Sequence, residues 1–262
     1  MAKLETIWRQ KTDDQHRKAL KKRLTKKSAQ VLFNSLKSAA NEKDIENAWR
    51  KVFTEYYVEN YDEGFEITSP ENVDGFISAR SGALIFALRL LLEFKQGTDL
   101  TRVNDRARIT CQCIHYMHAF KEKGYELPTV IVGADENQAF VLLAGNFYKY
   151  LERDYEWGIA PSSAYKRDLK LMRDLQDDAN LAVYPFQFVG GNVNERYNSL
   201  LDLFDSIDSI VQADGKETYK VAVSPATNDC RDVRRVQPYC LSRTRQDSAS
   251  QSRQYVHADA DR

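Results

Sequence analysis

The sequence predicts an α/β fold in which a small mixed central sheet is flanked by helices, with further helices added at the N- and C-terminal ends. Two observations support this prediction. Helical and strand patterns follow one another in the order helix, two short apolar segments, helix, strand and more helices. The 262 residues are 42% hydrophobic and 29% charged, so the chain can bury a sizeable core with an ordinary charged surface.

The first part of the chain is predicted to be helical. From Asp13 to Asn41 it is basic, and apolar residues recur at roughly helical spacing. Between Asp44 and Tyr57 a second helix is indicated by one apolar stripe. The stripe consists of Ile45, Ala48, Trp49, Val52, Phe53 and Tyr56. Residues 60–64 then carry a turn signal.

Two alternatives remain for the next segments. Short strands are indicated at 65–67 and 73–78, followed by a turn at 79–82. The leucine-rich segment 84–94 is long enough for a buried helix, but its position after a turn equally favours the second strand of a β-hairpin. Periodicity alone does not separate these alternatives.

The rest of the chain alternates helices with short strands. Asp99 or Thr98 could cap a helix over 100–123, which Gly124 would end. A strand is predicted at 129–134 with a partner at 139–143. Further predicted elements are helices at 146–153 and 163–176, a short strand near 183–189 and a helix at 193–212.

Charge is balanced overall but uneven along the chain. The net charge is zero, whereas residues 1–30 carry ten Lys and Arg against three Asp and Glu. Basic ends could contact phosphates, or they could simply be solvated. Residues 228–262 contain few long aliphatic side chains and no lysine, so we expect this tail to be disordered or not native to the domain. Neither a secretory signal nor a membrane span is indicated, and four cysteines do not form a disulfide framework, which predicts a cytoplasmic protein.

The hairpin alternative brings together a set of residues with a definite chemistry. In a strand, Glu93 and Lys95 share one face and Phe94 takes the other, while Asp74 on the preceding strand can face the same point. Carboxylates are ligands that Mg²⁺ prefers, and such a metal can activate water for phosphodiester hydrolysis. A neighbouring lysine can position or deprotonate that water and offset phosphate charge.

These residues resemble the motif of the PD-(D/E)XK nuclease superfamily. Asp74-Gly75 and Glu93-Phe94-Lys95 correspond to its two parts, although Val73 stands where the family usually has proline. In the following helix, Gln112 and Tyr116 lie four positions apart, so they share a face. They resemble the Gln-x-x-x-Tyr motif of the RecB-type members. The alternative for this pair is a core tyrosine with a hydrogen-bonded glutamine.

The resemblance implies a restriction-endonuclease-like core and a DNA endonuclease that uses Mg²⁺, with Mn²⁺ as a possible substitute. Asp74 and Glu93 would ligate the metal, Lys95 would assist the attacking water, and Gln112 and Tyr116 would support the site and the DNA. Members of the family often add an acidic residue from the first helix, for which the candidates here are Glu46 and Glu55; Glu46 is the one we select as a further ligand.

The resemblance also suggests a biological setting. The chain is similar to the N-terminal nuclease region of restriction-modification proteins that carry a DNA methyltransferase, so its implied partners are DNA and a methyltransferase domain or subunit. The predicted organisation is a basic helical segment at 1–40, a nuclease core at 41–145, a helical extension at 146–226 and the tail at 228–262. The alternatives are a catalytically silent DNA-binding or scaffold module, a repair or recombination nuclease, and a helical interaction protein in which 83–95 is a buried helix.

Two other groups of residues could form sites of a different kind. Cys111, His115 and His118 share a helix face and could suggest a soft-metal site, but packing and surface positions explain them better. Four aromatic residues could stack on bases, but an aromatic core or interface is the preferred interpretation. They are Tyr148, Tyr150, Tyr155 and Trp157.

Overall fold

The computed structural model describes residues 24–61, 63–80 and 87–223. The chain divides into a compact unit of residues 1–222 and a second unit of residues 223–262, so nearly all described residues belong to the first. The start of the predicted basic segment, the hairpin turn and the predicted tail lie outside the described residues. The predicted domain limits stay predictions.

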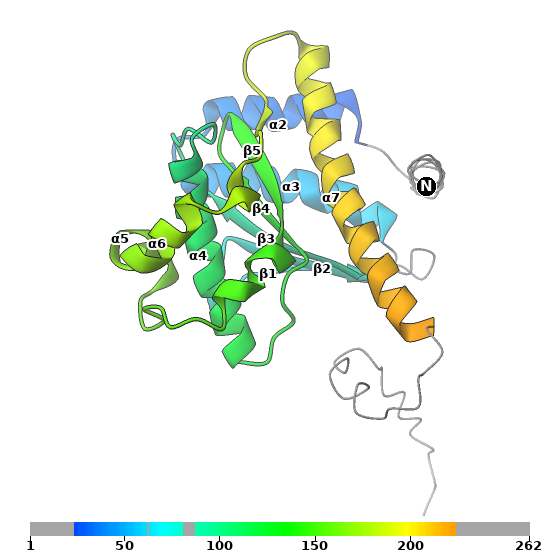
Figure 1. Cartoon of the computed structure of the whole chain (residues 1–262). Coiled ribbons are helices and arrows are strands. Elements are labelled where there is room, and N and C mark those ends of the chain that lie inside the picture. Colours follow the sequence, from blue (N-terminus) through cyan, green and yellow to red (C-terminus); the bar gives the residue numbers. More distant parts are fainter. Residues whose placement is uncertain (1–23, 62, 81–86, 224–262) are drawn as a thin grey trace, which may run out of the picture. The chain divides into compact units, whose positions relative to one another are not determined.

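A six-stranded mixed sheet forms the centre of this unit (Figure 1). Its strands lie in sequence order, and every neighbouring pair is antiparallel except β3 and β4, which are parallel. The strands are β1 (Glu63–Thr68), β2 (Gly75–Arg80), β3 (Ala87–Phe94), β4 (Val130–Ala134), β5 (Gln138–Leu143) and β6 (Phe186–Gln187). The predicted α/β fold with a mixed sheet flanked by helices is therefore confirmed.

The parallel pair explains the position of the long central helix. Parallel strands need a crossover connection, usually a helix, and α4 (Val103–Glu122) supplies it between β3 and β4. The helix ends as expected, because Gly124 has a φ of 71°, a conformation that glycine adopts without strain.

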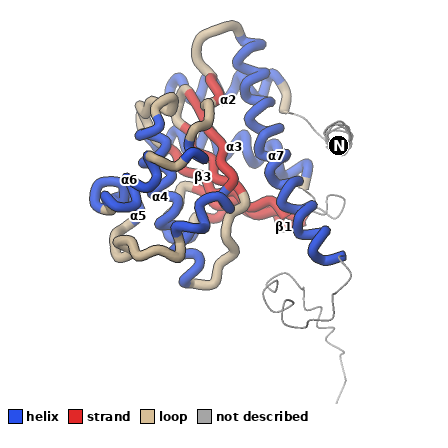
Figure 2. Tube along the Cα trace, in the orientation of Figure 1, coloured by secondary structure: helices blue, strands red, loops and turns tan. Residues whose placement is uncertain are grey.

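Helices cover both faces of the sheet (Figure 2). Leu90, Leu92 and Phe94 of β3 pack into one hydrophobic cluster, whereas Leu91 joins the other. This alternation follows from the two-residue period of a strand. The first cluster also contains residues of α2 (Lys26–Ser38), α3 (Glu42–Asn60) and α7 (Val193–Val223). The second contains residues of α4, α5 (Pro161–Arg167) and α6 (Leu169–Gln176).

The β-hairpin alternative for residues 73–94 is correct, and the buried-helix alternative is wrong. Strand β3 pairs in antiparallel register with β2, from Gly75 opposite Leu92 to Arg80 opposite Ala87. Asp74 lies directly before β2 rather than within it. Asp74 precedes Gly75 and Glu93 follows Leu92. Because Gly75 and Leu92 are paired, the hairpin register places Asp74 opposite Glu93 at the end of β3.

Three predicted helices differ in detail. The helix predicted from residue 100 begins at Val103, because Asp99 accepts hydrogen bonds from the backbone and hydroxyl of Thr101 in a preceding turn. The segment predicted at 146–153 is a 3₁₀ helix, η2 (Ala144–Tyr150). The segment predicted at 163–176 divides at Asp168, whose side chain caps α6 by accepting from the Leu171 backbone.

Among the described residues, no helix has both the length and the apolar character that crossing a membrane requires.

Candidate active site

Asp74 is fixed at the open end of the β2–β3 pair. Its Oδ2 accepts a hydrogen bond from the backbone N–H of Phe94 at 2.7 Å. This contact spans the two strands just beyond their last paired residues, Gly75 and Leu92. A carboxylate held by a backbone donor keeps a defined position without depending on a flexible side-chain partner.

Glu93 is buried on the side of the sheet that faces α4. It is 0% exposed, and its neighbour in the parallel register is Gly133 of β4. Its Oε1 accepts from the ammonium of Lys95 at 2.6 Å. Its Oε2 has no hydrogen-bond partner among the described residues. Because buried polar atoms are nearly always satisfied, this oxygen requires an explanation, and a bound cation is one.

The electrostatics show how strongly the carboxylates are crowded. Burial, followed by the charge of Asp74, raises the pKa of Glu93 to about 8, although Lys95 acts in the opposite direction. Burial also raises the pKa of Asp74, against the effects of the Phe94 N–H and Lys95. A cation placed between the two carboxylates would offset both effects.

Lys95 remains a cation in this environment. Burial lowers its pKa, but the carboxylates around it, first Glu93 and then Glu42 and Asp74, outweigh burial and leave the pKa above its ordinary value. The side chain is 23% exposed, so its ammonium group can still reach a bound ligand. The arrangement favours Lys95 as a hydrogen-bond donor to water or phosphate rather than as a base.

Glu46 lies beside the site, but its oxygens are engaged. Lys43 Nζ contacts both of them at 2.7 and 2.8 Å, and Arg50 donates to Oε1 at 3.1 Å. Arg50 also donates to the backbone oxygen of Asp74 at 2.9 Å, which links this cluster to the site. Glu55, the other candidate from the same helix, instead accepts a hydrogen bond from Ser28 on α2.

Glu42 is a neighbour of the site that the sequence did not suggest. Its Oε2 lies 3.7 Å from Lys95 Nζ, and its charge acts on Asp74 and Glu93. It stands in the first turn of α3, which Asn41 caps by accepting from the Asp44 backbone. That capping pattern could have placed the helix start earlier than Asp44 and brought Glu42 into consideration.

Gln112 and Tyr116 lie near this cluster on α4. Gln112 Nε2 donates to the Tyr116 hydroxyl at 3.3 Å, and that hydroxyl donates to the backbone oxygen of Asn72 at 3.2 Å. Burial and then the Glu93 carboxylate raise the pKa of Tyr116. Gln112 and Lys95 line the same small cavity of about 30 Å³. The pair is thus hydrogen-bonded within the core and also borders the carboxylate cluster.

The donor set fits a magnesium ion with few protein ligands. Among the described residues, no group of three or more His, Cys, Asp or Glu side chains is arranged to enclose a metal. Magnesium is commonly held by one or two carboxylates and completes its shell with water and substrate phosphate. Asp74 and Glu93 could supply those two carboxylates. Their crowding and the unpartnered Glu93 oxygen are consistent with that role.

The histidines and cysteines of α4 make packing contacts. His115 Nε2 lies 3.2 Å from Asp168 Oδ2, which connects α4 to the junction of α5 and α6. His118 stacks on Trp157 with ring centroids 3.9 Å apart. Cys111 and Cys113 are buried free thiols. These contacts account for the residues that could have suggested a soft-metal site.

The predicted aromatic group also lies in the interior. Tyr155 contacts the rings of Tyr150 and Trp157. Tyr150 and Tyr155 are buried, and Tyr148 and Trp157 pack against the same hydrophobic cluster. The residues therefore serve the core around α4 to α6.

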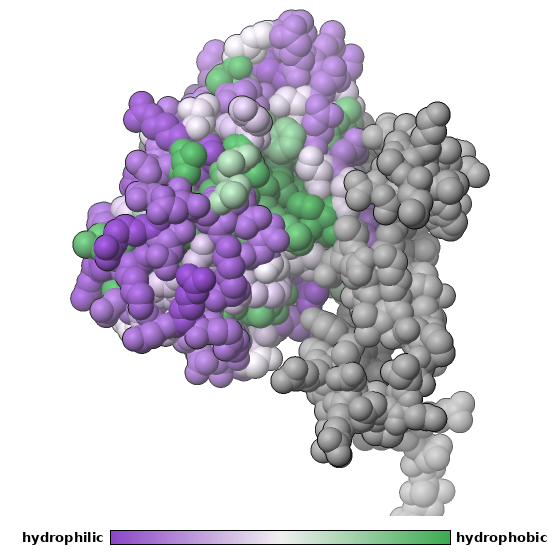
Figure 3. Space-filling view, in the orientation of Figure 1, coloured by the Kyte–Doolittle hydropathy of each residue, from purple (hydrophilic) through white to green (hydrophobic). Residues whose placement is uncertain are grey.

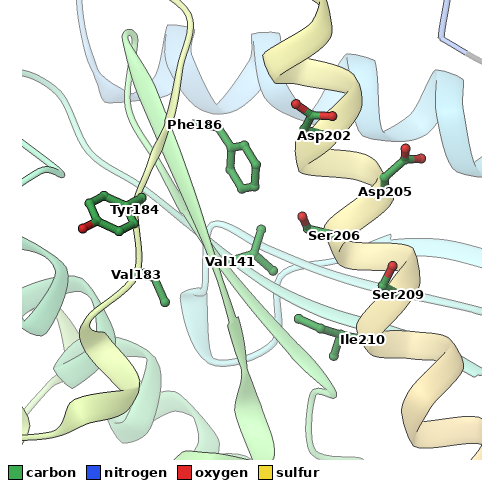
Figure 4. A pocket seen from close by; sticks show the side chains of 9 residues that line it. All are labelled: Val141, Val183, Tyr184, Phe186, Asp202, Asp205, Ser206, Ser209 and Ile210. Atoms are coloured by element: carbon green, nitrogen blue, oxygen red, sulfur yellow. The ribbon is translucent and has the colours of Figure 1, made fainter. Parts of the chain in front are cut away.

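A larger hollow of about 610 Å³ lies between the sheet and α7 (Figure 4). Its lining residues are Val141, Val183, Tyr184, Phe186, Asp202, Asp205, Ser206, Ser209 and Ile210. Figure 3 shows hydrophobic surface in this region. Because its charged lining residues are carboxylates, the hollow would repel phosphate, and we do not assign it to a nucleic acid.

Comparison with protein-family models, curated proteins and solved structures found no match to this chain. The nuclease interpretation therefore depends on the residues and their geometry.

Proposed function

We propose that this protein is a Mg²⁺-dependent DNA endonuclease. The observation that carries the proposal is the meeting of Asp74, Glu93 and Lys95 at the ends of β2 and β3, where a fully buried glutamate keeps one oxygen without a described partner. Two carboxylates can hold a metal that activates water for phosphodiester hydrolysis, and an ammonium group beside it can offset charge at the phosphate.

Each residue has a distinct role in this proposal. Asp74 and Glu93 would hold Mg²⁺, with Mn²⁺ as a possible substitute. When bound, the metal would supply an activated water and would neutralise charge at the attacked phosphate. Lys95 would orient that water and donate to a phosphate oxygen. The Phe94 N–H keeps Asp74 in place, and Gln112 and Tyr116 support the site from α4.

Glu42 and Glu46 enter the proposal differently. Glu42 faces Lys95 and helps to keep it protonated, whereas Glu46 is held by Lys43 and Arg50. Glu46 could ligate a metal only after releasing part of these ion pairs. We therefore regard it as an outer residue that positions Arg50 against the Asp74 backbone.

The biological setting is proposed from the motif resemblance. It favours restriction-modification, with a DNA methyltransferase domain or subunit as partner, over a repair or recombination role. A catalytically silent DNA-binding module is the rival that keeps the same fold. Cleavage activity separates this rival from the nuclease.

The proposal is tested by incubating supercoiled plasmid DNA with the full chain and Mg²⁺ or Mn²⁺. Asp74→Ala and Lys95→Ala should each abolish cleavage while circular dichroism shows an unchanged fold. Lys37→Ala, which changes an exposed residue of α2, is the matched control and should cleave normally. Retained cleavage in either site variant would reject the assigned roles, and no cleavage by the unaltered chain with either metal would favour the silent module.

A further inference from the structure

A cation–aromatic stack stands at the edge of the candidate site. The guanidinium carbon of Arg108 on α4 lies 4.5 Å from the ring centroid of Tyr165 on α5. Lys166 Nζ lies 5.3 Å from the same centroid. Arg108, followed by Lys166, lowers the pKa of the Tyr165 hydroxyl, although burial acts in the opposite direction. Two positive charges are therefore held at one aromatic side chain.

This stack is connected to the site by geometry. Arg108, Tyr165, Lys95 and Gln112 line the same cavity of about 30 Å³. Arg108 is four positions before Gln112, so the two lie on one face of α4. Arg108 pairs with Asp105 through one terminal nitrogen at 3.1 Å, and its side chain is 47% exposed. A guanidinium has five N–H donors, so others remain for an anion.

The basic surface continues from the stack onto α5 and α6. Lys166, Arg167, Lys170 and Arg173 are exposed, and none of them forms an ion pair with another described residue. Lys170 Nζ donates to the backbone oxygen of Asp154 at 2.6 Å and lies over the Tyr155 ring, and Arg173 Nε donates to the backbone oxygen of Leu169 at 3.2 Å. These contacts with neutral groups leave the positive charges uncompensated. Two acidic residues of this segment are engaged away from these cations, whereas Asp177 at the end of α6 is exposed. Asp168 is buried against His115, and Asp174 pairs with Arg153. Figure 3 shows the surface over α5 and α6 as largely hydrophilic.

Cations elsewhere in the described residues are often neutralised. Lys43, Lys121, Lys123 and Lys149 each pair with a carboxylate at 2.5 to 2.7 Å. Lys37 and Lys51 are also exposed and form no ion pair with a described residue, but the four cations of α5 and α6 lie within eight positions of one another and beside an aromatic stack. This group fits a ligand with regularly spaced negative charges, which a nucleic-acid backbone has.

We propose that Arg108, Tyr165 and the basic face of α5 and α6, formed by Lys166, Arg167, Lys170 and Arg173, bind the phosphate backbone of the DNA whose scissile phosphate lies at Lys95. Only the last part, the position of the cleaved phosphate, rests on the proposed function. Arg108 contacts the phosphate next to the cleaved one, and the face of α5 and α6 holds the strand beyond it. These residues supply binding that is independent of DNA sequence.

The test measures DNA binding apart from cleavage. The full chain is titrated onto a fluorescein-labelled duplex of about 20 base pairs in EDTA, and fluorescence anisotropy is recorded at several salt concentrations. The quadruple variant K166A/R167A/K170A/R173A should bind at least about tenfold more weakly. The slope of log affinity against log salt should become shallower by up to about 3.6, because each of the four lost phosphate contacts removes about 0.9 from it. Arg108→Ala should also weaken binding, and Arg108→Lys should weaken it less.

The matched control is K26A/K27A/K37A/K51A, which removes the same number of positive charges from exposed lysines of α2 and α3. It should leave both affinity and slope unchanged. Unchanged binding in the quadruple variant, or an equal loss in the control, would overturn the proposal.

The same variants are then tested for plasmid cleavage. Loss of binding by the quadruple variant when the unaltered chain binds DNA but does not cleave it would support this surface while rejecting the nuclease. Unchanged binding in a chain that does cleave would reject this surface and leave the nuclease in place.

Discussion

Two buried carboxylates stand near the ends of the parallel strands β3 and β4, and their surroundings differ. Asp135, directly after β4, accepts hydrogen bonds from the backbone N–H groups of Asn137 and Gln138, both at 2.6 Å. Glu93, in β3, accepts instead from the ammonium of Lys95. Each carboxylate has a second oxygen without a partner among the described residues.

The difference separates a structural carboxylate from a candidate catalytic one. Asp135 shapes the turn between β4 and β5, where its two backbone contacts repay part of the cost of burial. Glu93 shapes no turn and is placed near a second carboxylate, Asp74, which adds to the cost. A buried group that reduces stability is expected where chemistry requires it.

The largest expected effect is on cleavage by Glu93→Gln. The amide has nearly the same shape but cannot supply a charged ligand, so we expect plasmid cleavage to fall by at least about 100-fold. The melting temperature at pH 8 without metal should stay the same or rise, because a buried carboxylate with a raised pKa is removed. A large loss of stability with cleavage retained would assign Glu93 a purely structural role.

Asp135→Ala should show the opposite pattern. Removing the acceptor leaves two backbone N–H groups of the turn unsatisfied, which should lower the free energy of unfolding by about 1–3 kcal/mol. Urea denaturation measures this change. Cleavage by the folded fraction should remain within a few-fold of the unaltered protein. If cleavage were abolished at unchanged stability, Asp135 would belong to the site.

The pH dependence of stability should reveal the titration of Asp135. Burial raises its pKa from 3.8 to about 7, although the Asn137 and Gln138 N–H groups act against this shift. Between these values the folded protein keeps a proton that the unfolded chain has released, so stability should fall as the pH rises from about 4 to 7. Asp135→Asn should make that decline shallower in urea denaturation. An identical decline in both proteins would show that Asp135 does not titrate in this way.

The smallest expected effect is that of Tyr116→Phe. The hydroxyl links Gln112 to the backbone of Asn72 close to Asp74, and its removal should cost about 1 kcal/mol of stability. Cleavage should fall less than tenfold if this residue only supports the site. A loss as large as that of Glu93→Gln would instead indicate that the hydroxyl contacts DNA or the reacting group.

Local patterns predicted much of the fold. The apolar stripe from Ile45 to Tyr56 lies in α3, and Gly124 ends α4 as expected. The hairpin was only one of two alternatives, because β3 is buried on both faces and therefore lacks an exposed polar side that would show the two-residue period of a strand. The wrong start of α4 arose because an aspartate can order a turn as well as a helix end.

Local sequence patterns also predicted only part of the candidate site. The motif drew attention to Asp74, Glu93 and Lys95, and the structure brings these residues together. Their surroundings depend on contacts between distant segments, such as Arg50 with the Asp74 backbone. Glu42 was missed because nothing in its own segment indicates that Lys95, more than fifty positions later, lies 3.7 Å away.

The most direct test of the central claim is a calorimetric titration of Mn²⁺ into the metal-free full chain at pH 8. We expect a site whose affinity falls at least about tenfold in Asp74→Ala and in Glu93→Gln, because each variant removes one carboxylate ligand. Glu55→Gln, which changes a carboxylate of α3 bonded to Ser28, should bind like the unaltered protein. Equal Mn²⁺ binding by all four proteins, or no binding by the unaltered chain, would contradict the account.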